Sequence, residues 1–496
     1  MIDPAKTAQT IYNIGASGAW YSEGIGKYWP VEKKEKMAEL LFSKSFDAAG
    51  NPLGIGLSCW RFNIGGGTAE QGDSSGIRNQ LRRVESFLSA DGNYHLEKQS
   101  GYMWFVREAK KYGVENLIAF CNTAPVQMNK NGLGFKLEKN FITNLREDRY
   151  SAYADFLATV IEHFDKEGIH FNYISPVNEP QWDWSNKFGQ MNQEGSPWVN
   201  KDIYRIIVAL DSALLSKKLK TGILFPEAAT LTALYNGSGH ADKQVQQFFD
   251  EKSPYYTGRL TSAFPVAAGH SYFTDHGDSA IVNVRSRLRD TVMKYKANFW
   301  QSEYCMLGDG YKEGRKGKIP AIDCALFLAK IIHFDLTVAN ASAWQFWNAW
   351  EPGNSAFDVR YNLIALKINS DNTAGDFIAT KNLWALGQYS RFVRPGMKRF
   401  ITNRSDGLDD IQSSQDIMLS AFGNDEEFVF VIVNYAEKEK EVRVQIPGVK
   451  NIKYRKQYLT DVNNNMQKCS PSSLEKVKLP SRSVTTIVLG RKKKRN

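Results

Sequence analysis

Eight short apolar runs recur between residues 11 and 347, and most are separated by stretches whose apolar residues recur at helical spacing. Strands that alternate with amphipathic helices are typical of βαβ units, in which neighbouring strands run parallel. Eight such units predict a (β/α)8 TIM barrel, an α/β fold whose strands all end at one functional face. The predicted strands are 11–19, 55–64, 116–122, 171–177, 221–226, 267–272, 297–303 and 341–347. The predicted helices include 31–46, 149–166, 201–217, 279–296 and 322–336.

The texture of the sequence changes near residue 387. Short β-rich runs follow, separated by Gly, Asn, Pro and Asp and without helical spacing between them. This pattern predicts a C-terminal β-sandwich. A chain of 496 residues also exceeds the usual size of a single core. We therefore expect a catalytic barrel over 8–386, a β-sandwich over 387–490 to which the extreme N-terminus could contribute, and a basic tail over 491–496.

Charge and composition exclude several classes of function. Five of the ten net positive charges lie in the run 491–495, which leaves +5 on the remainder, so a nucleic acid partner is not indicated. No run approaches the roughly 18 apolar residues of a membrane span. The seven His show no HExxH, and the five Cys show no CxxC, so neither a metal nor a cofactor is expected. The N-terminus lacks a signal-peptide profile, which leaves a cytoplasmic protein or an exported one without its leader.

Two glutamates follow predicted strands that are far apart in the sequence. Glu179 comes directly after the run 171–177, and Glu303 ends the run 297–303. A single glutamate in such a place is commonly a solvated carboxylate, but two on one barrel face are what glycosidic bond cleavage requires. One would act as general acid and the other as nucleophile or base. We predict Glu179 and Glu303 as the catalytic residues.

Polar side chains accompany this pair on other predicted strands. Because side chains alternate along a strand, Arg61 shares one side with Asn63, and His270 shares one side with Tyr272. An arginine beside the nucleophile would keep it ionised, and a tyrosine hydroxyl would orient it. All four are predicted to contact substrate or the acids. Arg61 could equally form a structural ion pair, and His270 could be a hydrogen-bonded core histidine.

The same alternation makes two further predictions about the strand ends. Phe299, Gln301 and Glu303 should lie on one side of their strand. Glu227 closes the run 221–226 and is a third carboxylate that could belong to the site. The three consecutive glycines at 65–67 lack the lysine and the spacing of a phosphate-binding loop. They indicate a backbone that passes close to its neighbours, where a side chain would not fit.

Aromatic residues make up 12% of the chain, including 12 Trp, and flat rings with polar rims suit a sugar-binding surface. We predict that Trp182, Trp344 and Trp347 bind sugar, with Trp347 the foremost, although core packing is the alternative for such residues. Asn122 and Asn178, which lie at strand ends, are predicted to contact substrate as well.

Several segments together resemble glycoside hydrolase family 30, the glucosylceramidase and endoxylanase group of the 4/7 barrel clan. They are Asn178-Glu179-Pro180, His270-Ser271-Tyr272, Trp300-Gln301-Ser302-Glu303 and the segment 383–396. The resemblance implies that Glu179 is the acid/base and Glu303 the nucleophile of a retaining hydrolase. It implies that Asn178 bonds a sugar hydroxyl beside the cleaved bond. In that family the segment that 383–396 resembles leads from the barrel into the sandwich.

The segment 59–67 and the insertion 72–98 depart from the lysosomal branch and from the glucuronoxylan-specific xylanases. The chain looks most like uncharacterised bacterial members and, less closely, β-1,6-galactanases. We therefore expect an exported, monomeric β-glycoside hydrolase of a plant or host glycan such as β-1,6-galactan or β-glucan. A non-catalytic carbohydrate-binding barrel is the alternative, and a cytoplasmic location stays open. A barrel enzyme of another reaction class would need a phosphate or metal signature, which the sequence does not show.

Overall fold

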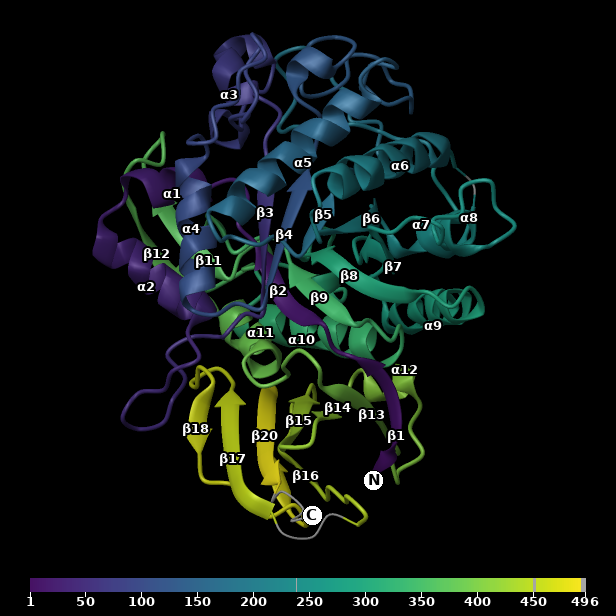
Figure 1. The fold of residues 1–496 in the computed structure, drawn as a ribbon. Helices are drawn as coiled ribbons and strands as arrows, with labels where there is room; N and C mark the ends of the chain where they lie inside the picture. The colour runs from purple at the N-terminus through teal and green to yellow at the C-terminus, as the bar shows by residue number, and fades with distance from the viewer. Residues whose placement is uncertain (238, 449–451, 492–496) are drawn as a thin grey trace.

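The computed structural model describes residues 1–237, 239–448 and 452–491. Within them, eight parallel strands close into a barrel surrounded by helices (Figure 1), which confirms the predicted fold. The barrel strands are β2 (Asn13–Ser17), β3 (Cys59–Ile64), β4 (Asn116–Cys121), β5 (Tyr173–Ser175), β6 (Gly222–Ala228), β7 (Ala263–His270), β8 (Asn298–Tyr304) and β9 (Ala343–Phe346). Each lies within a predicted run or overlaps one.

Most helices on the outside of the barrel bury one apolar stripe, as amphipathic spacing requires. The helix over Ala321–Thr337 is buried on nearly every side, because it lies between the barrel and the sandwich. All five of the predicted helices match helices of the structure, with ends that differ by at most four residues. The helices are α1 (Ser22–Tyr28), α2 (Val31–Phe42), α3 (Thr68–Gln71), α4 (Ser100–Lys111), α5 (Tyr150–Lys166), α6 (Asn200–Ser216), α7 (Leu231–Tyr235), α8 (Gln244–Phe249), α9 (Asp278–Lys294), α10 (Ala321–Thr337), α11 (Lys381–Ser390) and α12 (Asp410–Ser413).

The inside of the barrel is a packed floor and not a pore. Its buried apolar cluster combines small and large side chains from six of the barrel strands: Cys59, Ile118, Leu224, Val266, Ala268, Trp300 and Ala343. The Trp300 ring meets the Tyr173 ring at 4.9 Å and the Phe264 ring at 5.6 Å. Since this floor excludes water from below, polar side chains nearer the strand ends face a single opening.

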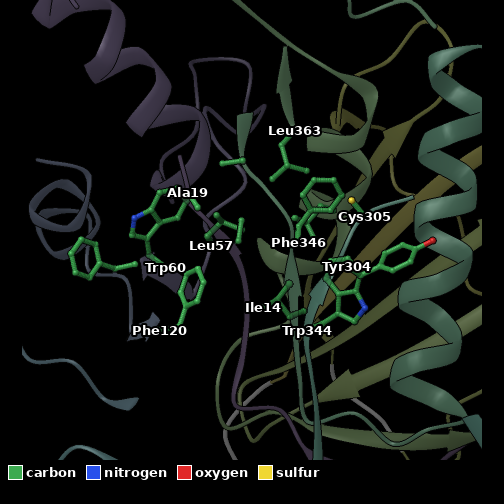
Figure 2. Close-up of a cluster of buried hydrophobic side chains, with 14 of the residues drawn as sticks. Ile14, Ala19, Leu57, Trp60, Phe120, Tyr304, Cys305, Trp344, Phe346 and Leu363 are labelled. Carbon is green, nitrogen blue, oxygen red and sulfur yellow. The ribbon is translucent and has the colours of Figure 1, made fainter. Parts of the chain in front are cut away.

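A larger core lies between the barrel strands and the surrounding elements. Figure 2 shows part of it, with Trp60, Phe120, Tyr304, Trp344 and Phe346 among the labelled side chains. Trp60 packs edge-on against Phe42 of α2, with ring centroids 5.1 Å apart. This burial anchors the outer helices to the strands.

The C-terminal region confirms the predicted β-sandwich. Among the described residues, its larger sheet has the order β1-β13-β14-β15-β20-β17-β18, and β16 pairs with β19. The first strand of the chain, β1, thus lies beside β13, as Figure 1 shows. The strands are β1 (Ile2–Thr10), β13 (Lys398–Thr402), β14 (Ile417–Gly423), β15 (Glu427–Asn434), β16 (Lys440–Val442), β17 (Ile452–Thr460), β18 (Gln467–Cys469), β19 (Val477–Leu479) and β20 (Ser483–Arg491).

Both faces of the larger sheet are covered, which explains the unbroken apolar run in β15. Val429, Val431 and Val433 join the barrel core, whereas Phe428 and Phe430 join a separate cluster with Val477 and Leu479 of β19. The proposed domain boundary at 386/387 falls inside α11, which contacts both the barrel helix α10 and strands β17 and β20. We propose that the chain passes from barrel to sandwich along α11.

A small sheet that the sequence did not predict, made of β10 (Trp350–Pro352), β11 (Ile364–Ile368) and β12 (Gly375–Ala379), is inserted between β9 and α11. No helix in the described ranges is long and apolar enough to cross a membrane. All five cysteines are described and free. Arg491 ends β20, and residues 492–496 of the predicted tail lie outside the described residues.

Candidate active site

The two predicted catalytic glutamates meet at the carboxyl ends of the barrel strands. Glu179 follows β5, the fourth barrel strand, and Glu303 belongs to β8, the seventh. One carboxylate oxygen of each lies within 4.8 Å of the other and of a His270 nitrogen. Both glutamates line a cavity of about 600 Å³. The structure therefore brings together two acids that are far apart in the sequence.

An irregular register in β8 lets Glu303 reach this cavity. Gly269 of β7 is paired with Gln301, but the next residue, His270, is paired with Glu303. Ser302 bonds the buried Glu227, so Ser302 and Glu303 both face the site. The prediction that Phe299, Gln301 and Glu303 share one side is therefore wrong, because regular alternation breaks where the strand bulges.

The backbone around Glu179 is held by three hydrogen bonds. Its N–H donates to the Glu227 carbonyl at 2.9 Å, and its own carbonyl accepts from the Trp182 N–H at 3.2 Å and the Trp184 indole at 3.0 Å. Glu179 has φ +45°, a conformation that non-glycine residues adopt rarely and that is enriched at functional sites. The loop after β5 is thus built to hold this carboxyl group in one place.

Arg61 and Tyr272 fix the orientation of Glu303. Arg61 Nη1 forms an ion pair with Glu303 Oε2, and the Tyr272 hydroxyl donates to Oε1 at 3.1 Å. Arg61 Nη2 also donates to Asn178 Oδ1 at 3.3 Å. Arg61 is fully buried and lies behind the cavity wall, whereas Asn178 and Tyr272 line it. Arg61 therefore acts through Glu303.

His270 lies between the carboxylates, fully buried. Its Nδ1 is 2.9 Å from Glu179 Oε1 and 3.6 Å from Glu303 Oε1, and its Nε2 is 3.3 Å from Glu227 Oε2. Burial lowers the pKa of His270, but the charge of Glu303 and the hydrogen bonds to Glu179 and Glu227 outweigh burial and raise it to about 10. The ring is thus a cation that donates from both nitrogens.

Glu227 is the third carboxylate, and it is structural. It is fully buried and accepts hydrogen bonds from the hydroxyls of Ser175, at 2.7 Å, and Ser302. Burial would raise the pKa of Glu227, but the charge of Arg61 and the contacts with His270 and Ser302 lower it to about 2. A permanently ionised Glu227 keeps Arg61 and His270 charged.

Glu179 is the carboxyl group suited to carry a proton. Burial raises its pKa, the hydrogen bond with His270 opposes this rise, and the charge of Glu303 adds to it. Burial is the larger of the two causes that raise the pKa of Glu179. Three carboxylates here face two cations, Arg61 and His270, so a proton on Glu179 makes the buried cluster neutral.

Glu179, His270 and Glu303 also have the spacing of a metal site. A histidine that binds a metal must be neutral, however, and the contacts with Glu303, Glu179 and Glu227 raise the pKa of His270 and so favour its charged form. Arg61 already occupies one oxygen of Glu303. The donor set therefore fits a charge-balanced acid pair and does not fit a cation.

The other predicted site residues divide into two groups. Asn122, Asn178, Trp182, Tyr272 and Trp347 line the cavity with the glutamates.

Trp344 and Asn63 do not reach the cavity, and both are fully buried. The indole of Trp344 donates to Asp335 Oδ2 at 2.9 Å, and Figure 2 shows it packed beside Tyr304 and Ile14. Trp344 therefore stabilises the core and is not a sugar platform, because its side of β9 faces the helices.

Sequence reasoning missed several residues that line the cavity. They come from segments that follow different barrel strands: Trp20, Arg82, Gln193, Phe273, Cys305, Leu307, Glu351 and Tyr361. Only their position after barrel strands could have indicated them, since the loop that carries Arg82 is an insertion of unpredicted course. The glycines 65–67 lead into that loop, and a Cβ on Gly65 would lie 2.3 Å from the Glu85 carbonyl, which confirms the need for room.

A (β/α)8 barrel with a sandwich and two facing carboxylates at its fourth and seventh strands defines a glycoside hydrolase of the 4/7 type. Residues 1–361 match the model of O-glycosyl hydrolase family 30. The chain therefore belongs to this family and is an O-glycosyl hydrolase, as the resemblance in its sequence implied.

Solved structures similar to this chain agree with the assignment. A conserved exported protein from Bacteroides fragilis is 34% identical, with a TM-score of 0.91, and the match covers 98% of this chain and 99% of that one. The catalytic domain of GH30 xylanase C from Talaromyces cellulolyticus is 19% identical, with a TM-score of 0.69 over 98% and 99% of the chains. The endo-beta1,6-glucanase BT3312 is 18% identical, with a TM-score of 0.65 over 99% and 93%. The last two matches show the fold alone.

Proposed function

We propose that this protein is a retaining β-glycoside hydrolase, with Glu303 as nucleophile and Glu179 as acid/base. The observation that carries the proposal is the spacing of the two carboxyl groups, whose nearest oxygens lie within 4.8 Å. Retaining enzymes hold these groups about 5–5.5 Å apart, whereas inverting enzymes need about 6.5–9.5 Å to admit water.

In the first step, Glu303 attacks the anomeric carbon while the bond to the leaving oxygen breaks and Glu179 gives that oxygen its proton. Arg61 and Tyr272 hold the two oxygens of Glu303, which fixes the line of attack. The product is a glycosyl ester on Glu303 and a free leaving alcohol.

In the second step, Glu179 takes a proton from water, the water oxygen attacks the anomeric carbon, and the ester bond to Glu303 breaks. Once Glu303 is esterified it carries no charge, which removes one cause of the raised pKa of Glu179. Glu179 is therefore a protonated acid before the first step and an ionised base after it. The sugar leaves with its original anomeric configuration and no cofactor is required.

The substrate we propose is a plant or host glycan with β-linked galactose or glucose, such as β-1,6-galactan or β-glucan. Two lines support this choice: the aromatic lining formed by Trp20, Trp182 and Trp347 suits sugar rings, and the fold resembles that of an endo-β-1,6-glucanase. We also propose that the protein is exported and monomeric. A similar chain of known structure is described as exported.

Activity measurements with stereochemical analysis test this proposal. The 2,4-dinitrophenyl β-glycosides of galactose, glucose and xylose, followed by β-1,6-galactan and β-glucan, should reveal a substrate, and the first product seen by proton NMR should be the β-anomer. Glu303→Gln should lower kcat by at least about 10⁴-fold, on the scale seen when a catalytic nucleophile is removed. The matched control is Glu115→Gln, which removes a surface partner of Arg394 and should leave kcat unchanged.

A 2-deoxy-2-fluoro glycoside of the best sugar should form an ester on Glu303, which peptide mass spectrometry locates. An α-anomeric first product, or a label on another residue, would contradict the mechanism. If the wild-type protein bound these glycans and hydrolysed none, the alternative of a non-catalytic carbohydrate-binding barrel would replace it.

A further inference from the structure

A second charged pair lines the cavity, apart from the catalytic cluster. Arg82 comes from a 3-10 turn (Gln80–Arg82) in the insertion after β3, and Glu351 belongs to β10. Arg82 Nη2 lies 3.4 Å from Glu351 Oε1, and their side chains are 25% and 13% exposed. Two segments that the sequence did not place near the site thus meet in its wall.

Both members of this pair keep hydrogen-bonding capacity. Glu351 Oε1 also accepts from Asn348 Nδ2 at 3.4 Å, and the Tyr21 hydroxyl bonds the same carboxylate, whereas an ionised carboxylate offers about four acceptor positions. The guanidinium of Arg82 stacks over the Trp20 ring at 4.3 Å, and its other bond, to Gln193 Oε1, is 3.5 Å long. These hydrogen bonds are long and therefore weak, so both side chains can also bond a ligand.

Three buried donors on residues that line the cavity lack a partner in the described part of the chain. Among the described residues, none accepts from Arg82 Nε, Trp20 Nε1 or Asn122 Nδ2. Trp20 and Asn122 are 3% and 2% exposed, and both residues line the cavity. Buried polar groups are almost always hydrogen-bonded, so these donors can gain a partner only where the surrounding side chains shift to admit a polar group.

The pair lies on the nucleophile side of the cavity. Glu303 is held by Arg61, whose guanidinium lies 4.0 Å from the Phe120 ring, and Phe120 contacts Trp347 at 6.0 Å. Trp347 in turn packs edge-on against Trp20 at 5.1 Å, and the guanidinium of Arg82 lies over the Trp20 ring. This wall is continuous and largely buried.

The acid/base side is different. Trp182, whose N–H bonds the Glu179 carbonyl, is 40% exposed, and it packs edge-on at 6.0 Å against Phe273, which is 52% exposed. The acid/base of a retaining hydrolase protonates the departing group, so the leaving group occupies this open side. The sugar attacked by the nucleophile occupies the buried side.

We propose that Arg82 and Glu351 determine specificity by binding hydroxyls of the sugar that Glu303 attacks. This inference rests on the proposed function. The carboxylate of Glu351 accepts hydrogen bonds from one or two hydroxyls, and Arg82 holds that carboxylate while donating to a sugar oxygen. Because Glu351 already engages Arg82, the pair offers no free cation to a carboxylate, so the site is matched to a neutral sugar and not to a uronic acid.

The test pairs one substitution in the protein with one deletion in the substrate. The substrates are the 2,4-dinitrophenyl β-glycoside that the wild type cleaves fastest and its monodeoxy analogues. For the wild type, loss of one hydroxyl should lower kcat/KM on the order of 100-fold, as expected for a hydrogen bond to a charged group. In Glu351→Gln, kcat/KM for the complete sugar should fall similarly, but deleting that same hydroxyl should cost less than about threefold more.

Arg82→Gln should weaken the discrimination between the complete and the deoxy sugar in the same direction. The matched control, Glu147→Gln, removes a surface carboxylate that pairs with Arg205 and should leave every ratio unchanged. If Glu351 had a purely structural role, Glu351→Gln would lower kcat/KM for the complete and the deoxy substrates by the same factor. That result would overturn the inference.

Faster cleavage of the β-glucuronide than of neutral glycosides would also overturn it, in favour of Arg82 as a carboxylate-binding residue. In both of these cases the label on Glu303 would still form, so the proposed function would stand. Without turnover or labelling of the wild type by any glycoside, the proposed function and this inference would fall together.

Discussion

Glu179, His270 and Glu227 show how single ionisable groups can set the pH range of the reaction. His270 lowers the pKa of Glu179 through its hydrogen bond and its charge, while burial raises it. We predict that kcat/KM declines as pH rises through the raised pKa of Glu179. Replacing His270 by Asn removes the opposing charge, so the pKa of Glu179 should rise further and the alkaline limb should move to higher pH.

The pH profile of kcat/KM measures this shift. Tyr272→Phe is the control, because its hydroxyl bonds Glu303 and not Glu179. It should lower kcat without moving the alkaline limb. An alkaline limb that moved down in His270→Asn would contradict the assignment of His270 as a cation beside the acid.

Trp344 and Trp347 are three residues apart, yet the structure gives them opposite roles. Trp344→Phe removes the indole bond to the buried Asp335, so it should cost about 1–3 kcal/mol of unfolding free energy and leave kcat/KM within about twofold. Trp347→Phe should lower kcat/KM by up to about tenfold, the scale of a lost aromatic contact, with little loss of stability. Urea unfolding and steady-state kinetics on both variants measure the contrast, and equal effects on activity would contradict it.

At the scale of elements, a buried acid joins two loops of the catalytic face. Glu194, in the loop after β5, is fully buried and accepts from the Gly66 N–H at 3.2 Å and the Thr68 hydroxyl at 2.6 Å, at the start of the loop after β3. Burial raises the pKa of Glu194 to about 7. The unfolded chain would release this proton near pH 4.5. The free energy of unfolding that protonated Glu194 contributes is therefore lost as pH rises from 4.5 to about 7.

Glu194→Gln should abolish that dependence. Between pH 5 and pH 8, the unfolding free energy of the wild type should fall by about 2–3 kcal/mol more than that of the variant. Guanidinium unfolding at both pH values measures the difference, and Glu115→Gln is a suitable control because its carboxylate is partly exposed and paired. Identical pH dependence in the wild type and Glu194→Gln would show that this acid is ionised in the folded state.

Most barrel elements could be predicted from the sequence, whereas their irregularities could not. The apolar runs and helical spacings located all eight barrel strands, and the glutamates after the fourth and seventh followed from them. The bulge in β8 was not predictable, because one extra residue in a ladder leaves no trace in an apolar pattern. Arg82 and Glu351 were missed for another reason: they lie in an insertion and in a small sheet whose courses depend on tertiary packing.

At the scale of the whole molecule, the barrel and the sandwich share buried polar contacts. His333 of α10 bonds the Ser420 hydroxyl of β14 at 2.8 Å, and Gln388 of α11 bonds the Thr460 hydroxyl of β17 at 2.8 Å. The valines of β15 join the barrel core. These contacts favour unfolding of the two bodies as one unit.

His333 should make this junction sensitive to acid. Burial lowers its pKa to about 3, whereas the unfolded chain takes up a proton near 6.5, so stability is lost as pH falls from 6.5 toward 3. The glutamine of His333→Gln can still bond Ser420. We predict that the free energy of unfolding of this variant falls by about 3 kcal/mol less than that of the wild type between pH 7 and pH 4. Thermal unfolding at the two pH values checks this. An unchanged slope would mean that His333 is charged at the junction.

The pairing of β1 with β13 has a consequence for biosynthesis. At about 5–20 residues per second, the ribosome delivers β13 roughly 20–80 s after β1, and the whole barrel emerges in the interval. During that time β1 presents an unpaired edge to the cell. Because all eight barrel strands precede β13 in the chain, the barrel can form on the nascent chain before β1 meets its partner, and the first strand of the chain joins the molecule in the later stage of folding.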